Sequence, residues 1–478
     1  MNYSVIRYVL GNVFKMMTAL LLLPVLVSII YRENVGYLYL AVAAASFVIG
    51  TLLTIKKPEN SKIYLKEGCV ITALSWLVMS ATGAVPFCIT GEIPNYIDAL
   101  FETASGFTTT GSSILSEVES LTHTALIWRS FTHWTGGMGV LVFLLAVIPM
   151  TGGSNMNLMK AESPGPSVGK LVPKVRQTAR ILYMIYLALT VIEFIFLVAG
   201  GLPAFDSICM TFGTAGTGGF GVKNDSAMSY TAYQQWVLTV FMILFGVNFN
   251  FYYFLLLKKT KLALKMEEVK GYFAIVFTFT AIITLDNLAR FDKIATSARH
   301  AAFQVATCMT TTGFASDDFD TWSSLSKTLL VLLMFCGACA GSTGGGIKVS
   351  RILIAFKTWK NEMVSFIHPK SIRHIKYDGK PLDKTTEHSV ARYFITYITI
   401  FVISLLIVSF EGKDLITNFT SVTATINNIG PGLSIVGPTG NYASFNPLSK
   451  LVFIFDMLAG RLELYPMLII FHPAVWKK

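Results

Sequence analysis

Four short stretches of the sequence combine hydroxyl, amide and glycine residues in a way that suits the binding of a bare cation. They are Thr108, Thr109, Thr110 and Gly111; Gly216, Thr217, Gly218 and Gly219; Thr310, Thr311, Thr312 and Gly313; and Asn427, Asn428, Ile429 and Gly430. A desolvated monovalent cation must exchange its water shell for oxygens, and backbone carbonyls supply them without a fixed charge. Glycine permits the backbone angles that turn successive carbonyls toward one axis. The four stretches therefore predict four sides of a carbonyl-lined filter.

Each stretch lies in a segment that is too long for a simple loop and begins with an apolar run too short to cross a bilayer. These segments are 90–123, 201–230, 289–324 and 411–447. Such runs suggest re-entrant segments, whose short helices would point their partial negative charge at the ion. One Thr-Thr-Thr-Gly alone is typical of an ordinary loop. Four copies between pairs of apolar spans predict a unit of helix, re-entrant segment and helix that is repeated four times.

The composition of the 478-residue chain is that of a membrane protein. Hydrophobic residues make up 53% and charged residues 14%, whereas a soluble protein carries about 25% charged residues. Apolar stretches recur along the whole chain, which excludes disorder, coiled coil and fibre. Ten of them are long enough to cross a bilayer, the eighth with an interruption. The predicted spans are 9–31, 36–55, 69–89, 124–150, 179–200, 231–257, 270–288, 325–356, 390–410 and 448–472.

The net charge of +11 is explained by membrane orientation rather than by nucleic-acid binding. Most of the 38 Lys and Arg residues lie in alternate connections between the spans, and basic connections stay on the cytoplasmic side. Both termini are therefore predicted to be cytoplasmic. The basic loops at 157–180, 258–270 and 357–390 offer a docking surface for an acidic or nucleotide-carrying partner, although anionic lipid would explain them equally.

The eighth span contains a glycine-rich interruption. Five glycines within ten residues cannot maintain a stable helix, and unwound backbone at membrane depth must face protein or a cavity. This indicates an unwound segment inside the span, with a close helix contact as the alternative. Its candidate functional residues are Gly337, Gly341, Gly344, Gly345, Gly346 and Lys348.

Arg461 is a further candidate functional residue, because it lies inside the last predicted span. A charge at that depth is costly and usually faces a bundle interior or an aqueous path. The alternatives are an arginine that reaches the cytoplasmic interface, or one paired with Glu463 or Asp456.

Other polar residues have weaker interpretations. Acidic residues near the predicted re-entrant helices could concentrate cations at the mouth, and helix capping explains two of them, Asp98 and Asp206, equally well. These acidic residues are Asp98, Glu102, Asp206, Asp317 and Asp318. His123, His133 and His300 lack metal-ligand spacing and are expected to be core or interface residues. The six Cys residues lack zinc or disulfide spacing.

On the repeated filter motif, the chain resembles TrkH-type members of the Trk/Ktr/HKT superfamily of potassium transporters, over nearly all of residues 60–478. The resemblance implies an all-α membrane protein with two extra N-terminal helices and four fused, potassium-channel-like repeats around a central pore. It also implies that the glycine-rich loop gates conduction below the filter and that Arg461 projects into the pore. Some relatives have a serine at the first filter glycine, which goes with sodium transport. All four positions are glycine here, which favours potassium, although the second and fourth stretches depart from Thr-Thr-Thr-Gly and predict an imperfect ring.

The resemblance implies partners as well. These are a second copy of the chain in a homodimer and a cytosolic ring of TrkA-type regulatory subunits that bind NAD(H) or ATP, while this chain itself binds no nucleotide. The expected location is the bacterial inner membrane. Sodium uptake, or symport of K⁺ with Na⁺ or H⁺, is the alternative function. An enzyme is not expected, because no cluster of carboxylates, histidines or metal ligands is found. The predicted divisions are 1–60 for the extra helices and 61–155, 156–265, 266–360 and 361–478 for the repeats.

Overall fold

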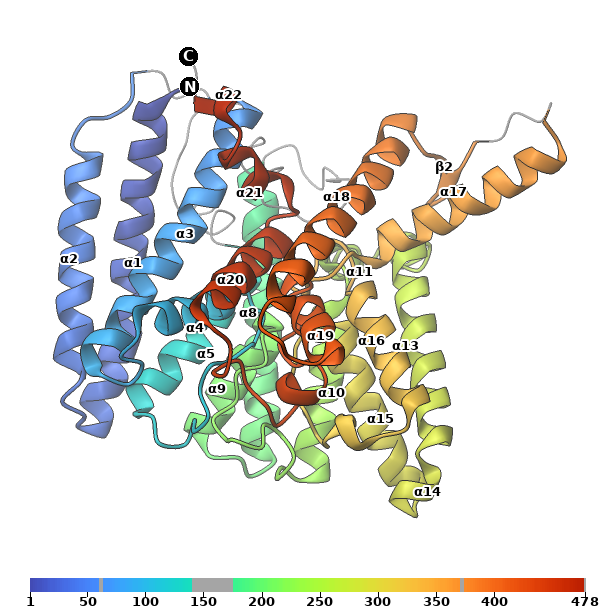
Figure 1. The fold of residues 1–478 in the computed structure, drawn as a ribbon, viewed down its shortest axis with the longest axis horizontal. Coiled ribbons are helices and arrows are strands. Elements are labelled where there is room, and N and C mark those ends of the chain that lie inside the picture. The colour runs from blue at the N-terminus through green and yellow to red at the C-terminus, as the bar shows by residue number, and fades with distance from the viewer. Residues whose placement is uncertain (60–62, 140–174, 370–373, 477–478) are drawn as a thin grey trace.

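The computed structural model describes residues 1–59, 63–139, 175–369 and 374–476. In this part of the chain, helices account for nearly all regular structure (Figure 1). The strands described there, β1 (Lys376–Tyr377) and β2 (Lys380–Pro381), have two residues each and pair antiparallel as a hairpin. The first two helices, α1 (Tyr3–Tyr31) and α2 (Gly36–Thr54), pack on each other along one side of the molecule.

Four units follow, each with a first helix, a short pore helix and an inner helix. The first comprises α3 (Leu65–Thr90), α4 (Tyr96–Phe107) and α5 (His123–Gly137), and the second α8 (Val175–Ala199), α9 (Ala204–Gly216) and α10 (Ala232–Gly246). The third comprises α13 (Glu267–Asp286), α15 (Ile294–Met309) and α16 (Ser324–Cys336), and the fourth α18 (Lys384–Ser409), α19 (Leu415–Ile426) and α20 (Pro447–Arg461). All twelve helices lie within the repeat boundaries predicted above, which themselves stay predictions.

The four units close into a ring. The inner helix of each unit packs on the pore helix of the next: α5 on α9, α10 on α15, α16 on α19, and α20 on α4 of the first unit. The inner helices also begin in the same way, because a polar side chain accepts a hydrogen bond from the backbone N–H three residues later. These capping residues are Thr122, Thr231, Ser323 and Asn446.

Two of the spans predicted to be continuous are broken into two helices in the structure. Six helices of the described residues are long and apolar enough to cross a membrane (α1, α2, α3, α8, α13 and α18), and α10 with α11 (Phe249–Leu256) would be a seventh that bends by 88°. The prediction of one continuous helix over 231–257 is therefore wrong, as it is over 448–472, where α20 ends at Arg461 and α21 (Tyr465–Ile470) follows.

The last turns of two inner helices, α5 and α20, lie very close to the pore helices of their own units. At Gly136 and Gly460 the backbone lies so close to the pore-helix carbonyls of Phe107 and Ile426 that a side chain would overlap them. Residues 140–150 of the predicted span 124–150 lie outside the described residues.

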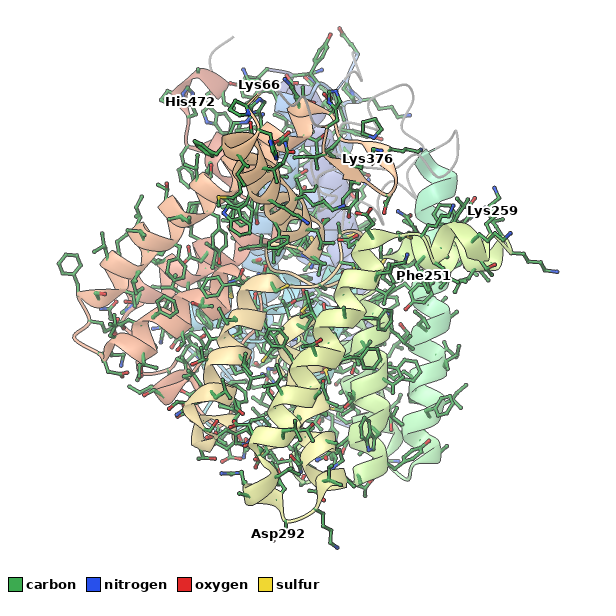
Figure 2. All side chains as sticks on the ribbon, turned by 90° about the vertical axis from the view of Figure 1, so that its right-hand side faces the viewer. Lys66, Phe251, Lys259, Asp292, Lys376 and His472 are labelled. Atoms are coloured by element: carbon green, nitrogen blue, oxygen red, sulfur yellow. The ribbon has the colours of Figure 1, made fainter. Side chains whose placement is uncertain are left out.

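The remaining elements connect the units or lie at the ends of the molecule. They are α12 (Thr260–Ala263), α14 (Leu288–Phe291), η1 (Phe319–Thr321), α17 (Val349–Ile367), η2 (Ser434–Val436) and α22 (Pro473–Trp476). Both termini lie at the same end of the molecule (Figure 1). Lys66, Lys376 and His472 lie toward that end and Asp292 lies at the opposite one (Figure 2).

Candidate functional site

All four pore helices end in the same hydrogen bond. The backbone N–H of the third filter residue donates to a carbonyl five residues earlier, which is the wide turn of a Schellman motif. The pairs are Thr110 with Ser105 (2.8 Å), Gly218 with Gly213 (2.8 Å), Thr312 with Thr307 (2.9 Å) and Ile429 with Ala424 (2.9 Å). The chain therefore leaves each pore helix in the same direction.

The backbone angles of the four filter stretches also agree. The second residue is left-handed each time, with φ of 56° at Thr109, 56° at Thr217, 58° at Thr311 and 56° at Asn428. The final glycine has a positive φ as well, 82° at Gly111, 79° at Gly219, 90° at Gly313 and 98° at Gly430. Left-handed angles cost a non-glycine residue about 1–2 kcal/mol, so their recurrence indicates one shared geometry. The fourth stretch keeps it although its sequence is Asn-Asn-Ile-Gly.

Each filter glycine lies against the filter stretch of the next unit, so the four stretches form a closed ring. A Cβ atom on Gly111 would overlap the carbonyl oxygen of Gly218, and one on Gly219 would overlap that of Thr312. One on Gly313 would overlap the carbonyl oxygen of Ile429, and one on Gly430 would lie against the carbonyls of Thr110 and Gly111. All four glycines line one cavity, together with residues of the connections to the inner helices. The structure thus brings all sixteen predicted filter residues together.

Different side chains support the ring in different units. In the first and third units, two threonine hydroxyls pair behind the filter, Thr108 with Thr110 (2.8 Å) and Thr310 with Thr312 (2.7 Å). In the fourth unit, Asn428 Nδ2 donates to Thr110 Oγ1 (2.9 Å) and so joins the fourth stretch to the first. The second stretch has glycine at both positions where these threonines stand.

The predicted glycine-rich interruption lies directly beneath the filter. Helix α16 ends at Cys336, α17 begins at Val349, and residues 337–348 form an irregular loop. Gly345 N–H donates to Thr311 Oγ1 (2.6 Å) and Gly346 N–H donates to the carbonyl of Asn427 (3.1 Å). The buried Lys348 ammonium donates to the carbonyl of Gly344. The break was predictable from the glycines, and its contact with two filter stretches was not.

Arg461 is the last residue of α20 and connects the loop to the first unit. Its guanidinium donates to the carbonyls of Thr343 (2.7 Å), Gly136 (2.6 Å) and Gly137 (2.8 Å). The two glycine carbonyls belong to the last turn of α5, where the helix dipole favours a cation. Glu463 pairs instead with Arg351, and Asp456 accepts a hydrogen bond from Ser404 (2.7 Å).

Glu102 is not an exposed charge at the mouth, so that interpretation was wrong. Its carboxylate is buried, forms an ion pair with Arg129 at 2.7 Å, and accepts hydrogen bonds from Ser113 and from the backbone of Ile114. Arg129 also contacts the carbonyl of Gly221, just after the second filter stretch (3.4 Å). An arginine inside a predicted span was the available signal for this pair.

Of the other acidic candidates, two lie next to basic side chains. Asp98 pairs with Lys450 (2.6 Å), and the N-cap of its helix is Asn95. Asp206 lies in the first turn of α9. Asp317 lies near Arg290 (3.5 Å), and Asp318 caps η1.

The remaining predictions concern histidines, cysteines and metal ligands. His123 bonds to Glu33, and His300 to Ser316, in agreement with interface and core roles. All six cysteines are free. Within the described residues, no group of three or more His, Cys, Asp or Glu side chains could hold a metal ion.

Comparison with known proteins decides the family. The sequence model of the TrkH family, described as a cation transport protein, matches residues 39–478. The chain belongs to the TrkH family. It is 35% identical to the Trk system potassium uptake protein TrkH of Escherichia coli K12 over the full length of both chains. It is 30% identical to TrkG of the same organism, over 100% of this chain and 99% of that one.

The fold agrees with this membership. The crystal structure of the potassium transporter TrkH from Vibrio parahaemolyticus superposes with a TM-score of 0.89 at 28% identity and covers both chains completely. The predicted family and the all-α, channel-like membrane fold are thereby confirmed. TrkH-family membership also makes the chain a cation transport protein and not an enzyme.

Proposed function

We propose that the chain is a potassium uptake subunit that conducts K⁺ through the ring of its four filter stretches. The observation that carries this proposal is the closed ring, in which four backbones of one geometry touch each other and all four glycines line one cavity. The names of the relatives as potassium uptake proteins support it.

The chemistry of the ring favours a monovalent cation. The sixteen filter residues contain no ionised side chain, so ions would be held by carbonyl and hydroxyl dipoles alone. A glycine is present in all four units, which supports potassium over the alternative of sodium uptake. Symport of K⁺ with Na⁺ or H⁺ through the same ring is the second alternative, and ion-gradient dependence of uptake distinguishes it.

The loop 337–348 and Arg461 are proposed to form the gate. The loop lies against filter residues of the third and fourth units, and Arg461 donates to a loop carbonyl, so this layer obstructs the route below the ring. We further propose that a homodimer carries this pore, with cytosolic TrkA-type subunits that bind NAD(H) or ATP and control the loop. The inner membrane of a bacterium is the proposed location. Lys66 and Lys376, which lie toward the end with both termini (Figure 2), support a cytoplasmic position for that end.

Uptake into proteoliposomes tests the proposal. Purified chain is reconstituted, and uptake of labelled K⁺, Rb⁺ and Na⁺ is compared for the wild type, Gly111→Ser and Gly91→Ser. Gly91 has nearly the same positive φ (79°) but no atom near the position of a Cβ, so it controls for backbone strain alone. We expect selective K⁺ and Rb⁺ uptake that Gly111→Ser shifts toward Na⁺ and Gly91→Ser leaves selective. Wild-type Na⁺ uptake equal to that of K⁺ would contradict the potassium assignment.

A further inference from the structure

The second filter stretch is the one in which glycine occupies the first and third positions, at Gly216 and Gly218. The corresponding positions in the other units carry side chains, and in the first and third units these are threonines whose hydroxyls pair with each other. A different residue fills this space in the second unit. It is His133 from α5 of the first unit, the inner helix that packs on pore helix α9.

His133 occupies the volume that a third-position side chain would need. A Cβ atom on Gly218 would overlap the imidazole ring, at 2.6 Å from Cδ2 and closer still to Cγ and Nδ1. A Cβ atom on Gly216 would instead overlap the backbone carbonyl of His133. The imidazole is fully buried. The departure of this stretch from Thr-Thr-Thr-Gly therefore has a steric cause.

The imidazole also makes two hydrogen bonds, which join the end of pore helix α4 to the residue that follows the second filter stretch. Its Nδ1 lies 2.8 Å from the carbonyl oxygen of Gly106, in the last turn of pore helix α4. Its Nε2 accepts the backbone N–H of Phe220, the residue after filter glycine Gly219, at 3.2 Å. Because a carbonyl only accepts and an N–H only donates, the neutral tautomer with hydrogen on Nδ1 satisfies both. The Phe220 ring packs on the imidazole with centroids 4.2 Å apart.

We propose that His133 is the positioning residue of the second filter stretch, and that it holds this stretch in register with the first and thereby sets cation selectivity. It takes the place of the paired threonine hydroxyls that support the first and third stretches. The inference rests on the proposed function, because it assigns a selectivity role within the same ring.

Side-chain replacements separate the two hydrogen bonds. His133→Asn keeps a donor near the Nδ1 position, His133→Gln places an acceptor near the Nε2 position, and His133→Ala removes both. We expect the ratio of K⁺ to Na⁺ uptake to fall about three- to tenfold for each buried hydrogen bond lost. His123→Ala on the same helix is the control, since His123 bonds to Glu33 and not to the filter. It should leave the ratio unchanged.

Rescue by a second substitution tests the steric relation. Gly218→Thr should abolish selective uptake and lower the melting temperature of the purified protein when His133 is present. In the His133→Ala background the same threonine should fit, and should recover part of the lost selectivity and stability. Gly216→Thr is the matched control, because it meets backbone and should be damaging in both backgrounds.

The outcomes separate the two proposals. A non-selective wild type overturns the proposed function and the selectivity role of His133 together. A selective wild type with unchanged selectivity in His133→Ala, or a Gly218→Thr that is equally damaging with and without His133, overturns the inference alone. Loss of selectivity with Gly218→Thr rescue supports it. If His133→Ala does not fold, the Asn and Gln variants decide through the same uptake ratio.

Discussion

The filter ring and the layer directly beneath it draw on the same four units in different ways. In the ring, each unit contributes the same backbone, with a left-handed second residue, a positive-φ glycine and the same helix-ending hydrogen bond. In the layer beneath, the third unit contributes a whole loop, 337–348, and the fourth contributes Arg461. The first and second units contribute the carbonyls that hold these groups, at Gly136 and Phe245.

On the proposed function, this difference follows from what each layer would have to do. A ring that replaces a hydration shell needs equivalent oxygens on all sides, so repetition of the backbone matters more than the identity of the side chains. An obstruction beneath it needs one segment that can leave the path while its neighbours stay. The loop suits this, since its glycines tolerate several backbone conformations and few of its bonds reach the filter.

The largest expected effect on ion selectivity comes from substitutions that make one filter stretch differ from the other three. Gly313→Ala and Gly430→Ala should each reduce the ratio of K⁺ to Na⁺ uptake by about a hundredfold, because both force a positive-φ side chain against the next stretch, at ~1–3 kcal/mol of strain. Gly412→Ala in the fourth unit is the control, with φ of 74° and no atom near a Cβ. A nearly normal Gly430→Ala beside a defective Gly313→Ala would show that the fourth side is not equivalent.

The repetition in the ring was predictable from the sequence, because glycine and threonine spacing is a local signal. The signal is weaker in the fourth stretch, which lacks the threonines. Asn428 nevertheless adopts the φ of Thr109 and Thr311, so the backbones of the stretches are equivalent although their sequences differ. The glycine-rich loop was likewise predicted, since its composition alone prevents a helix.

The partners of the buried polar residues could not be predicted. Glu102 lies far from Arg129 in sequence, and Arg461 meets carbonyls of residues hundreds of positions away. His133 contacts a filter stretch that belongs to another unit. Such pairs depend on how separate helices pack on one another, within a unit and between units, which periodicity within one segment does not encode. Helix ends at Gly246 and Arg461 were missed because the apolar pattern continues past them.

A smaller effect, on the rate of K⁺ uptake, is expected from substitutions in loop 337–348 beneath the filter ring. Gly345→Ala would place a methyl group against the carbonyl of Asn427 and the side chain of Asn428, and so push the loop away from the filter. We expect K⁺ uptake without regulatory subunits to rise about tenfold, as for one or two lost hydrogen bonds, with the K⁺ to Na⁺ ratio unchanged. Gly341→Ala is the control for backbone strain in the same loop, since Gly341 has a φ of 69° but its nearest neighbour would be Asn248 at 3.4 Å and not the filter. A changed ion ratio in Gly345→Ala would mean that loop and ring do not act separately.

The smallest expected effect distinguishes two roles of Arg461. If its charge alone hinders K⁺, Arg461→Lys should behave as the wild type. If it also connects the loop to α5, Arg461→Lys should raise K⁺ uptake about threefold. The ammonium of a lysine cannot replace the planar guanidinium, which donates to the carbonyls of Thr343, Gly136 and Gly137 at once. The three hydrogen bonds come from carbonyls of two different units, so we expect the second result. Arg461→Ala, which removes charge and connection, should then exceed Lys in the same flux measurement while the ratio of K⁺ to Na⁺ stays that of the intact ring.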